Sequence, residues 1–157
     1  MVAEERKFTI SDLIYAFKLG SKSVGIDFLI KEMGLDEHKV MIDQEIRVKA
    51  FYYCVDLACE YFLISKDGFF SSSRKQDLVS ARQIVAYIMR YKYRMSATEI
   101  GKRMNRDHAT SIHSCKVVTN YLETNDEQTI NAYTFISSKM DEMEEEIKEQ
   151  LKEVENV

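Results

Sequence analysis

The stretch that decides the fold runs over residues 96–120, SATEIGKRMNRDHATSIHSCKVVTN. Ser96 is followed three residues later by Glu99, which is the spacing of a capping box and predicts that a helix begins here. That helix must be short, because residues 105–107, Asn-Arg-Asp, are typical of turns. Asp107 can then cap a second helix, since its carboxylate can accept hydrogen bonds from the free N–H groups of the first turn. The sequence therefore predicts two helices joined by a tight basic turn.

The second helix has two different faces when its residues are placed at about 100° intervals. The apolar face is predicted to be buried and consists of Ile112, Cys115, Thr119 and Leu122, with Val118 at its edge. The opposite face is predicted to be exposed and consists of Ala109, Thr110, His113, Lys116, Val117 and Asn120. A helix of this kind can lie in the major groove of DNA and touch base edges from its first turns. An ordinary surface hairpin explains the same pattern, so the pattern alone leaves both interpretations open.

A wider set of motifs occurs in unbroken order along the chain. The motifs are Ala58–Phe62 with Phe69–Arg74, then Ala81–Ile88, then Ile100-Gly101 with Met104–His108, and finally Thr110, Ile112–Ser114 and Val118. Together they resemble the C-terminal DNA-binding domain of DnaA, the bacterial replication initiator, over roughly residues 44–125. The resemblance implies an all-α fold, a helical bundle with a helix-turn-helix. One residue is missing in the turn, where many relatives carry two glycines.

The resemblance also implies which residues contact double-stranded DNA. Arg74 lies where the family extends an arginine into the minor groove, whose narrow A·T-rich form concentrates negative potential. Base edges in the major groove are expected to meet Thr98, Asp107, His108 and Ala109. Phosphate contacts are expected from Arg82, Gln83, Arg90, Ser96, His113 and Lys116. Arg106 and Thr110, at the start of the second helix, complete the predicted set.

The chain departs from the family at positions that affect the target site. Ala109 stands where relatives usually have threonine, and Thr98 where many have proline. Ser111 and Val117 replace a typical apolar and a typical basic residue. The expected target is therefore either an initiator-box-like site or a related site that contains A·T pairs. No Gly-x-x-x-x-Gly-Lys-Ser/Thr loop occurs in the 157 residues, so we expect a regulator of replication or transcription and not an initiator ATPase.

Charge is distributed unevenly along the chain, whose formal net charge is −4. From Ser71 to Leu122, ten basic residues stand against three acidic ones, a balance of +7 that leaves −11 for the remainder. A cationic module between anionic arms is typical of a DNA-binding protein that has separate interaction segments.

Several other classes of protein are not expected. The three cysteines, Cys54, Cys59 and Cys115, lack metal-ligand spacing and are expected to be reduced core residues of a cytoplasmic protein. His108 and His113 lie five residues apart, so on one helix they point about 140° from each other and cannot chelate one ion. We therefore expect no metal or cofactor. No catalytic constellation, membrane-spanning segment or signal peptide is evident, so neither an enzyme nor a membrane protein is expected.

Apolar residues at helical spacing, together with the absence of proline, predict helices on both sides of the hairpin. Residues 44–64 are expected to be a core helix, residues 68–76 a polar loop, and residues 123–127 a break before a further helix. The long helix before the hairpin is expected to open at Asp77 or Ser80 and to end near Tyr93. Its predicted inward face is Leu78, Ala81, Val85, Ile88 and Met89, with Arg82, Gln83 and Arg90 on other sides.

The chain is expected to divide into three segments. Residues 1–43 form an N-terminal helical extension, residues 44–138 the domain with the hairpin, and residues 139–157 an acidic amphipathic C-terminal helix. Both extensions are candidates for binding a protein partner or for self-association. A second function therefore stays open, in which the chain is a protein-interaction module that keeps the helical bundle and binds a partner through its acidic arms.

Overall fold

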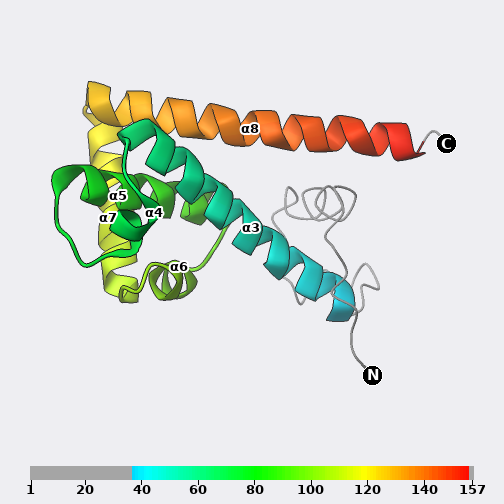
Figure 1. Ribbon diagram of the computed structural model, residues 1–157, viewed down its shortest axis with the longest axis horizontal. Coiled ribbons are helices and arrows are strands. Elements are labelled where there is room, and N and C mark those ends of the chain that lie inside the picture. The colour runs from blue at the N-terminus through cyan, green and yellow to red at the C-terminus, as the bar shows by residue number, and fades with distance from the viewer. Residues whose placement is uncertain (1–36, 156–157) are drawn as a thin grey trace. The chain divides into compact units, whose positions relative to one another are not determined.

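The structure, a computed structural model, describes residues 37–155, and all regular secondary structure in that range is α-helical (Figure 1). The helices are α3 (Glu37–Phe62), α4 (Lys66–Phe70), α5 (Gln76–Tyr91), α6 (Ala97–Arg103), α7 (His108–Glu123) and α8 (Glu127–Glu155). The predicted all-α fold is confirmed. Most of the predicted N-terminal extension, residues 1–36, lies outside the described residues.

Contacts divide the chain into two compact units, of which one is residues 49–140. The other unit combines residues 1–48 with residues 141–157, and its described parts are the first turns of α3 and the last turns of α8. The boundary expected between residues 138 and 139 falls inside α8, which continues without a break. The three-segment division of the chain stays a prediction.

The core of the unit 49–140 is formed by one face of each long helix. In α5 the predicted inward residues are all buried, from Leu78 at 7% exposure to Val85 and Met89 at 0%. Phe51 and Cys54 from α3 and Ile136 and Met140 from α8, each with no exposed surface, complete the same core. Full burial of one large apolar side chain contributes about 1.5–3 kcal/mol, so this interior is the main source of stability.

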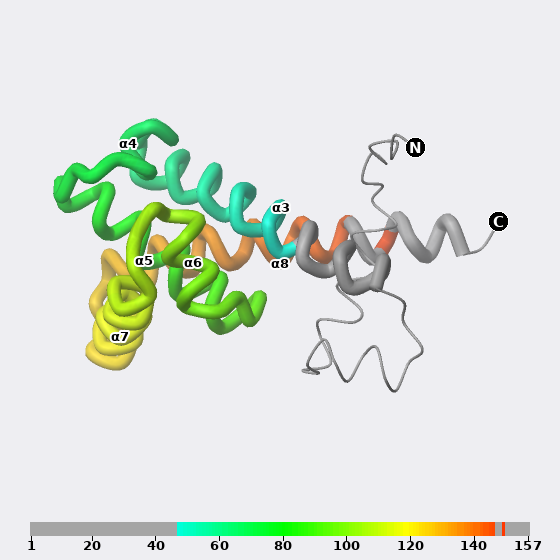
Figure 2. Tube along the Cα trace, turned by 90° about the horizontal axis from the view of Figure 1, so that it is seen from below, coloured from blue at the N-terminus to red at the C-terminus, as the bar shows by residue number. Residues whose placement is uncertain are grey.

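Helices α5, α6 and α7 pack against one another, and they lie together in both views (Figure 1, Figure 2). Aromatic pairs add α8 to this group, because Tyr87 of α5 and Tyr133 of α8 have ring centroids 5.6 Å apart. Tyr61 of α3 and Phe135 of α8 are similarly close, at 5.3 Å. The hairpin α6–α7 is therefore held on a packed helical scaffold.

Some predicted helix ends differ from the structure. Residues 68–70 were expected in a loop but form the end of α4, because the hydroxyl of Ser65 caps that helix by accepting from the Gly68 N–H at 3.0 Å. Helix α5 ends at Tyr91, two residues before the predicted end. The break predicted over residues 123–127 is shorter in the structure, where residues 124–126 form the turn between α7 and α8.

Candidate nucleic-acid interface

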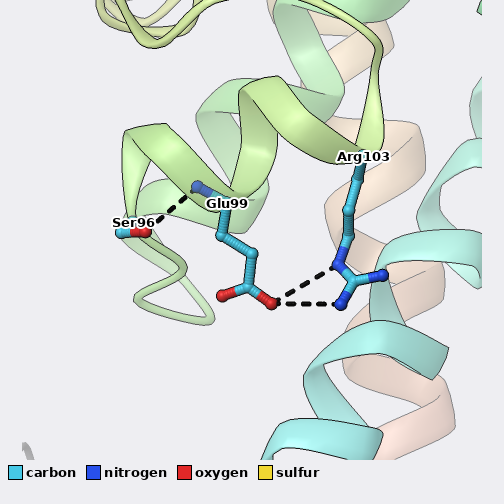
Figure 3. A network of polar contacts seen from close by, with 3 residues as sticks. All are labelled: Ser96, Glu99 and Arg103. Carbon is cyan, nitrogen blue, oxygen red and sulfur yellow. Dashed lines mark hydrogen bonds and ion pairs between the residues drawn. The ribbon is translucent and has the colours of Figure 1, made fainter.

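Helix α6 begins at the predicted cap. The hydroxyl of Ser96 accepts a hydrogen bond from the Glu99 N–H at 3.1 Å (Figure 3). The carboxylate of Glu99 pairs with the guanidinium of Arg103, one turn further on, at 3.3 Å (Figure 3). This i,i+4 pair replaces the reciprocal bond of a complete capping box and adds a few tenths of a kcal/mol, about 0.3–0.5. Both contacts support a short helix that ends where the turn begins.

The turn after α6 depends on a close approach of two backbones. Asn105 has a positive φ of 55°, and the Arg106 N–H reaches back to the Gly101 carbonyl at 2.7 Å, which is a Schellman arrangement. A Cβ on Gly101 would lie 2.6 Å from the Arg106 carbonyl oxygen and 2.9 Å from that of Asp107. Only glycine fits this position without moving the turn. Gly101 therefore sets how closely α6 approaches the start of α7.

Asp107 caps α7 as the sequence predicts. Its Oδ1 accepts from the backbone N–H of Thr110 at 2.8 Å and from the Thr110 hydroxyl, also at 2.8 Å. These two bonds hold the pKa of the Asp107 carboxyl below its ordinary value. Because both bonds use Oδ1, Oδ2 has no hydrogen bond to any residue that the structure describes. An exposed carboxylate oxygen thus lies at the N-terminus of α7.

The two faces of α7 are rotated relative to the prediction. Cys115 and Val118 are buried as expected, but Ile112 is 39% exposed, so its predicted burial is wrong. Ser111 and Ser114 are buried in its place, at 3% and 8% exposure. Helix α7 packs on α5 and α6 at once, and small side chains allow that close approach where a larger apolar one does not. Hydrophobicity alone therefore misplaces the inner face.

The exposed face of α7 carries most of the hairpin residues that the sequence predicts for it. Its exposed members, together with the exposed cap residue, are Asp107, His108, Ala109, Thr110, His113, Lys116 and Asn120. Ser96 and Thr98 at the start of α6, and Arg90 near the end of α5, are also exposed. The structure thus leaves accessible every predicted major-groove residue.

A groove of about 540 Å³ runs beside this face. It brings together predicted site residues from α5, from α7, from the turn between α6 and α7 and from the loop before α5, namely Arg74, Arg82, Gln83, Arg106, Thr110 and His113. Arg74 is exposed and makes no ion pair within the part of the chain that the structure describes. The groove therefore offers positive charge that internal carboxylates do not neutralise.

Comparison with known proteins finds a family that the hairpin resembles. Residues 53–118 match the family described as the bacterial dnaA protein helix-turn-helix. This segment is therefore called the DnaA-type domain. Three relatives are each a chromosomal replication initiator protein DnaA. That of Bacteroides thetaiotaomicron is 34% identical over 98 residues, covering 59% of this chain and 21% of the relative. The Porphyromonas gingivalis protein is 35% identical over 100 residues, covering 60% of this chain and 21% of the relative. The Synechococcus protein is 40% identical over 65 residues, covering 41% of this chain and 14% of the relative.

The DnaA-type domain is thus the part of the chain that resembles these relatives. The chain spans about one fifth of the length of the first curated relatives that it matches, with 21% of each of four of them covered. No solved structure matches it significantly.

Arg82 lies elsewhere in the DnaA-type domain than the sequence predicts. The sequence places Arg82 on a side of α5 other than the inward apolar face and expects it to contact a phosphate, but in the structure this residue is buried, at 6% exposure. Its guanidinium donates to four backbone carbonyls of α4 and of the loop that follows it: Phe69 at 2.6 Å, Ser73 at 2.7 Å, Ser71 at 2.8 Å and Gly68 at 3.0 Å. Burial, with the nearby charge of Arg106, lowers the pKa of Arg82. Apart from the motif that contains Arg82, no sequence signal predicts these four hydrogen bonds, because their acceptors are main-chain atoms.

Arg106 of the DnaA-type domain is half-buried and also binds main-chain oxygens. It donates to the Met104 carbonyl at 3.2 Å and to the Ser71 carbonyl at 2.8 Å. The second bond joins the turn of the hairpin to the loop before α5, thirty-five residues away in the sequence. Sequence analysis placed Arg106 in the DNA-binding set but did not reveal this link.

The described residues show no sign of two other kinds of site. No group of three or more His, Cys, Asp or Glu side chains within them is arranged to hold a metal ion. Among the described helices, none has both the length and the apolar character to cross a membrane.

Proposed function

We propose that the chain binds double-stranded DNA sequence-specifically, with α7 in the major groove and Arg74 in the neighbouring minor groove. The observation that carries this proposal is the exposed face of α7, capped by Asp107 and held on a rigid scaffold beside a groove that contains unpaired arginine charge. The match of this segment to the DnaA-type helix-turn-helix family supports it independently.

Each exposed residue has a defined part in the proposed complex. Oδ2 of Asp107 can accept from a cytosine amino group while Oδ1 keeps the helix cap. His108 can offer a ring nitrogen to a base edge, and the Ala109 methyl can contact a thymine methyl, with Thr98 beside them. Phosphates are met by Gln83, Arg90, Ser96, His113 and Lys116.

The target and the biological role follow from what differs from the relatives. The resemblance favours an initiator-box-like site, whereas Ala109 and Thr98, which stand where relatives usually have threonine and proline, favour a related site with A·T pairs. The 157 residues hold no phosphate-binding loop, so no ATPase activity is proposed for them, and the role proposed for their DNA binding is regulation of replication or transcription. Action on such sites places it in the bacterial cytoplasm.

The proposal is tested by fluorescence anisotropy with a duplex that carries an initiator box and with a scrambled duplex, at two salt concentrations. If about four phosphates are neutralised, log K should fall with log salt with a slope of about −3.6. The boxed duplex should bind at least about a thousandfold more tightly than the scrambled one. No binding at low salt would leave the protein-interaction module as the better account.

Two variants separate base reading from charge. His108→Ala should weaken binding to the boxed duplex by about 5- to 150-fold and leave the scrambled duplex nearly unaffected, because it removes a base contact. Lys116→Ala should weaken both duplexes about equally and reduce the salt slope by about one. Lys102→Ala, on the exposed surface of α6 and outside the proposed site, is the matched control. Equal behaviour of all three variants would show that α7 does not face the DNA.

A further inference from the structure

We propose that Arg82 and Arg106 form a brace that fixes the loop of residues 71–75 against the hairpin, and that Arg82 is a positioning residue for DNA reading and not a phosphate contact. The claim about DNA rests on the function proposed above. The claim about the loop concerns the free protein and stands by itself.

The brace is visible in the hydrogen bonds of one main-chain oxygen. The Ser71 carbonyl accepts from the Nη2 atom of Arg82 and from the Nη2 atom of Arg106, both at 2.8 Å. One arginine belongs to α5 and the other to the turn before α7. The loop that carries Arg74 is therefore attached at the same point to both elements.

All three guanidinium nitrogens of Arg82 donate hydrogen bonds within the brace. Nε, Nη1 and Nη2 together make four bonds to carbonyls between Gly68 and Ser73. No carboxylate among the described residues pairs with Arg82, so these neutral dipoles are what offset the cost of burying its charge. To reach a phosphate the side chain must release carbonyls that are partly buried, which costs about the full penalty of leaving them unpaired.

The brace thereby fixes the proposed minor-groove residue relative to the proposed major-groove residues. The loop places Arg74, the proposed minor-groove residue, three residues beyond the braced Ser71. Arg106 places the first turn of α7, which carries the proposed major-groove residues. A fixed geometry between the two allows both grooves to be contacted without ordering the loop on binding, so less conformational entropy is lost.

The brace is tested first without DNA, by limited trypsin digestion of the full chain. Lysine keeps the charge at position 82 but cannot reproduce the fork of donors, so Arg82→Lys is the informative variant. Cleavage after Arg74 and Lys75 should be about tenfold faster or more, while cleavage after Lys116 inside α7 changes little. Arg103→Lys, which alters an arginine of α6 outside the loop, should leave the pattern unchanged. Unchanged cleavage in Arg82→Lys, or a rise shared equally by Lys116, would overturn the brace.

The DNA arm uses two duplexes that differ only in the minor groove. The A·T pairs of the initiator box are replaced by inosine·cytosine in one and by guanine·cytosine in the other, so only the second presents a minor-groove amino group. Arg74→Ala should reduce the preference for the inosine duplex, and Arg82→Lys should reduce it to a similar extent. Combining the two substitutions should produce little further loss.

The outcomes separate the brace from a phosphate contact and from the proposed function. If Arg82 met a phosphate, Arg82→Lys would keep the inosine preference and most of the affinity, which would overturn the positioning role. A mere loss of folded protein would lower binding to both duplexes equally and would also overturn it. If the wild-type chain binds neither duplex, the proposed function fails, and the trypsin result still decides the brace.

Discussion

Replacement of Gly101 by alanine tests how tightly α6 must approach the start of α7. The new Cβ would lie 2.6 Å from the Arg106 carbonyl oxygen, and the neighbouring contacts at 2.9 and 3.0 Å are also backbone atoms of the turn. No rotamer change relieves a clash with backbone, so overpacking should cost about 2–3 kcal/mol. Loss of the 2.7 Å bond from the Arg106 N–H adds about 1 kcal/mol, and the higher helix propensity of alanine returns about 1 kcal/mol.

The net destabilisation expected for Gly101→Ala is therefore about 2–3 kcal/mol. For a domain of the size of residues 49–140 this corresponds to a fall in Tm of about 8–24 °C, measured by circular dichroism. Gly68→Ala is the matched control, because its nearest neighbours are the side-chain atoms Ser65 Oγ at 3.1 Å and Leu78 Cδ2 at 3.2 Å, which can shift. Its stability should change by less than about 1 kcal/mol. A Gly101→Ala variant that melts at or above the wild-type temperature would refute the reasoning.

Three further predictions concern helix ends and thiols. Leu63 is 91% exposed with a φ of 54°, so Leu63→Gly should stabilise the fold by up to about 1 kcal/mol in urea unfolding, and destabilisation would count against the helix-end geometry. Asp107 has a lowered pKa, so its contribution to stability is complete above the ordinary value of 3.8 and is lost as pH falls through the lower folded value. Asp107→Asn should therefore reduce the loss of unfolding free energy between neutral and acidic pH, measured by urea unfolding at a series of pH values. An unchanged dependence on pH would contradict the role of Asp107 as the cap. Burial raises the pKa of the Cys54 and Cys115 thiols, so iodoacetamide should modify them only on unfolding; rapid modification of the native protein would disprove their burial.

Local chemistry made the hairpin predictable. A hydroxyl at Ser96 and a carboxylate at Asp107 satisfy N–H groups within three residues, so short sequence windows contain the whole interaction. The inward face of α5 was predictable for a similar reason, because a periodic run of apolar residues has one way to be buried. These features together placed most of the candidate site.

The features that sequence did not predict arise from contacts between distant segments. The buried position of Arg82 requires carbonyls of α4 and of the loop after it, nine to fourteen residues earlier in the sequence, and no residue type marks main-chain acceptors. Burial of Ser111 and exposure of Ile112 depend on how closely α7 approaches two other helices. The continuity of α8 past residue 138 follows from the absence of a helix breaker, although the change in composition suggested a boundary there.

The central claim is that α7 reads the major groove of DNA, and methylation interference on a duplex with an initiator box tests it most directly. Guanine N7 lies in the major groove, so a methyl group there blocks a helix that enters it. We predict that methylation of guanines within the box removes the complex, whereas methylation outside the box leaves it intact. Formation of the complex with fully methylated guanines in the box would contradict the account.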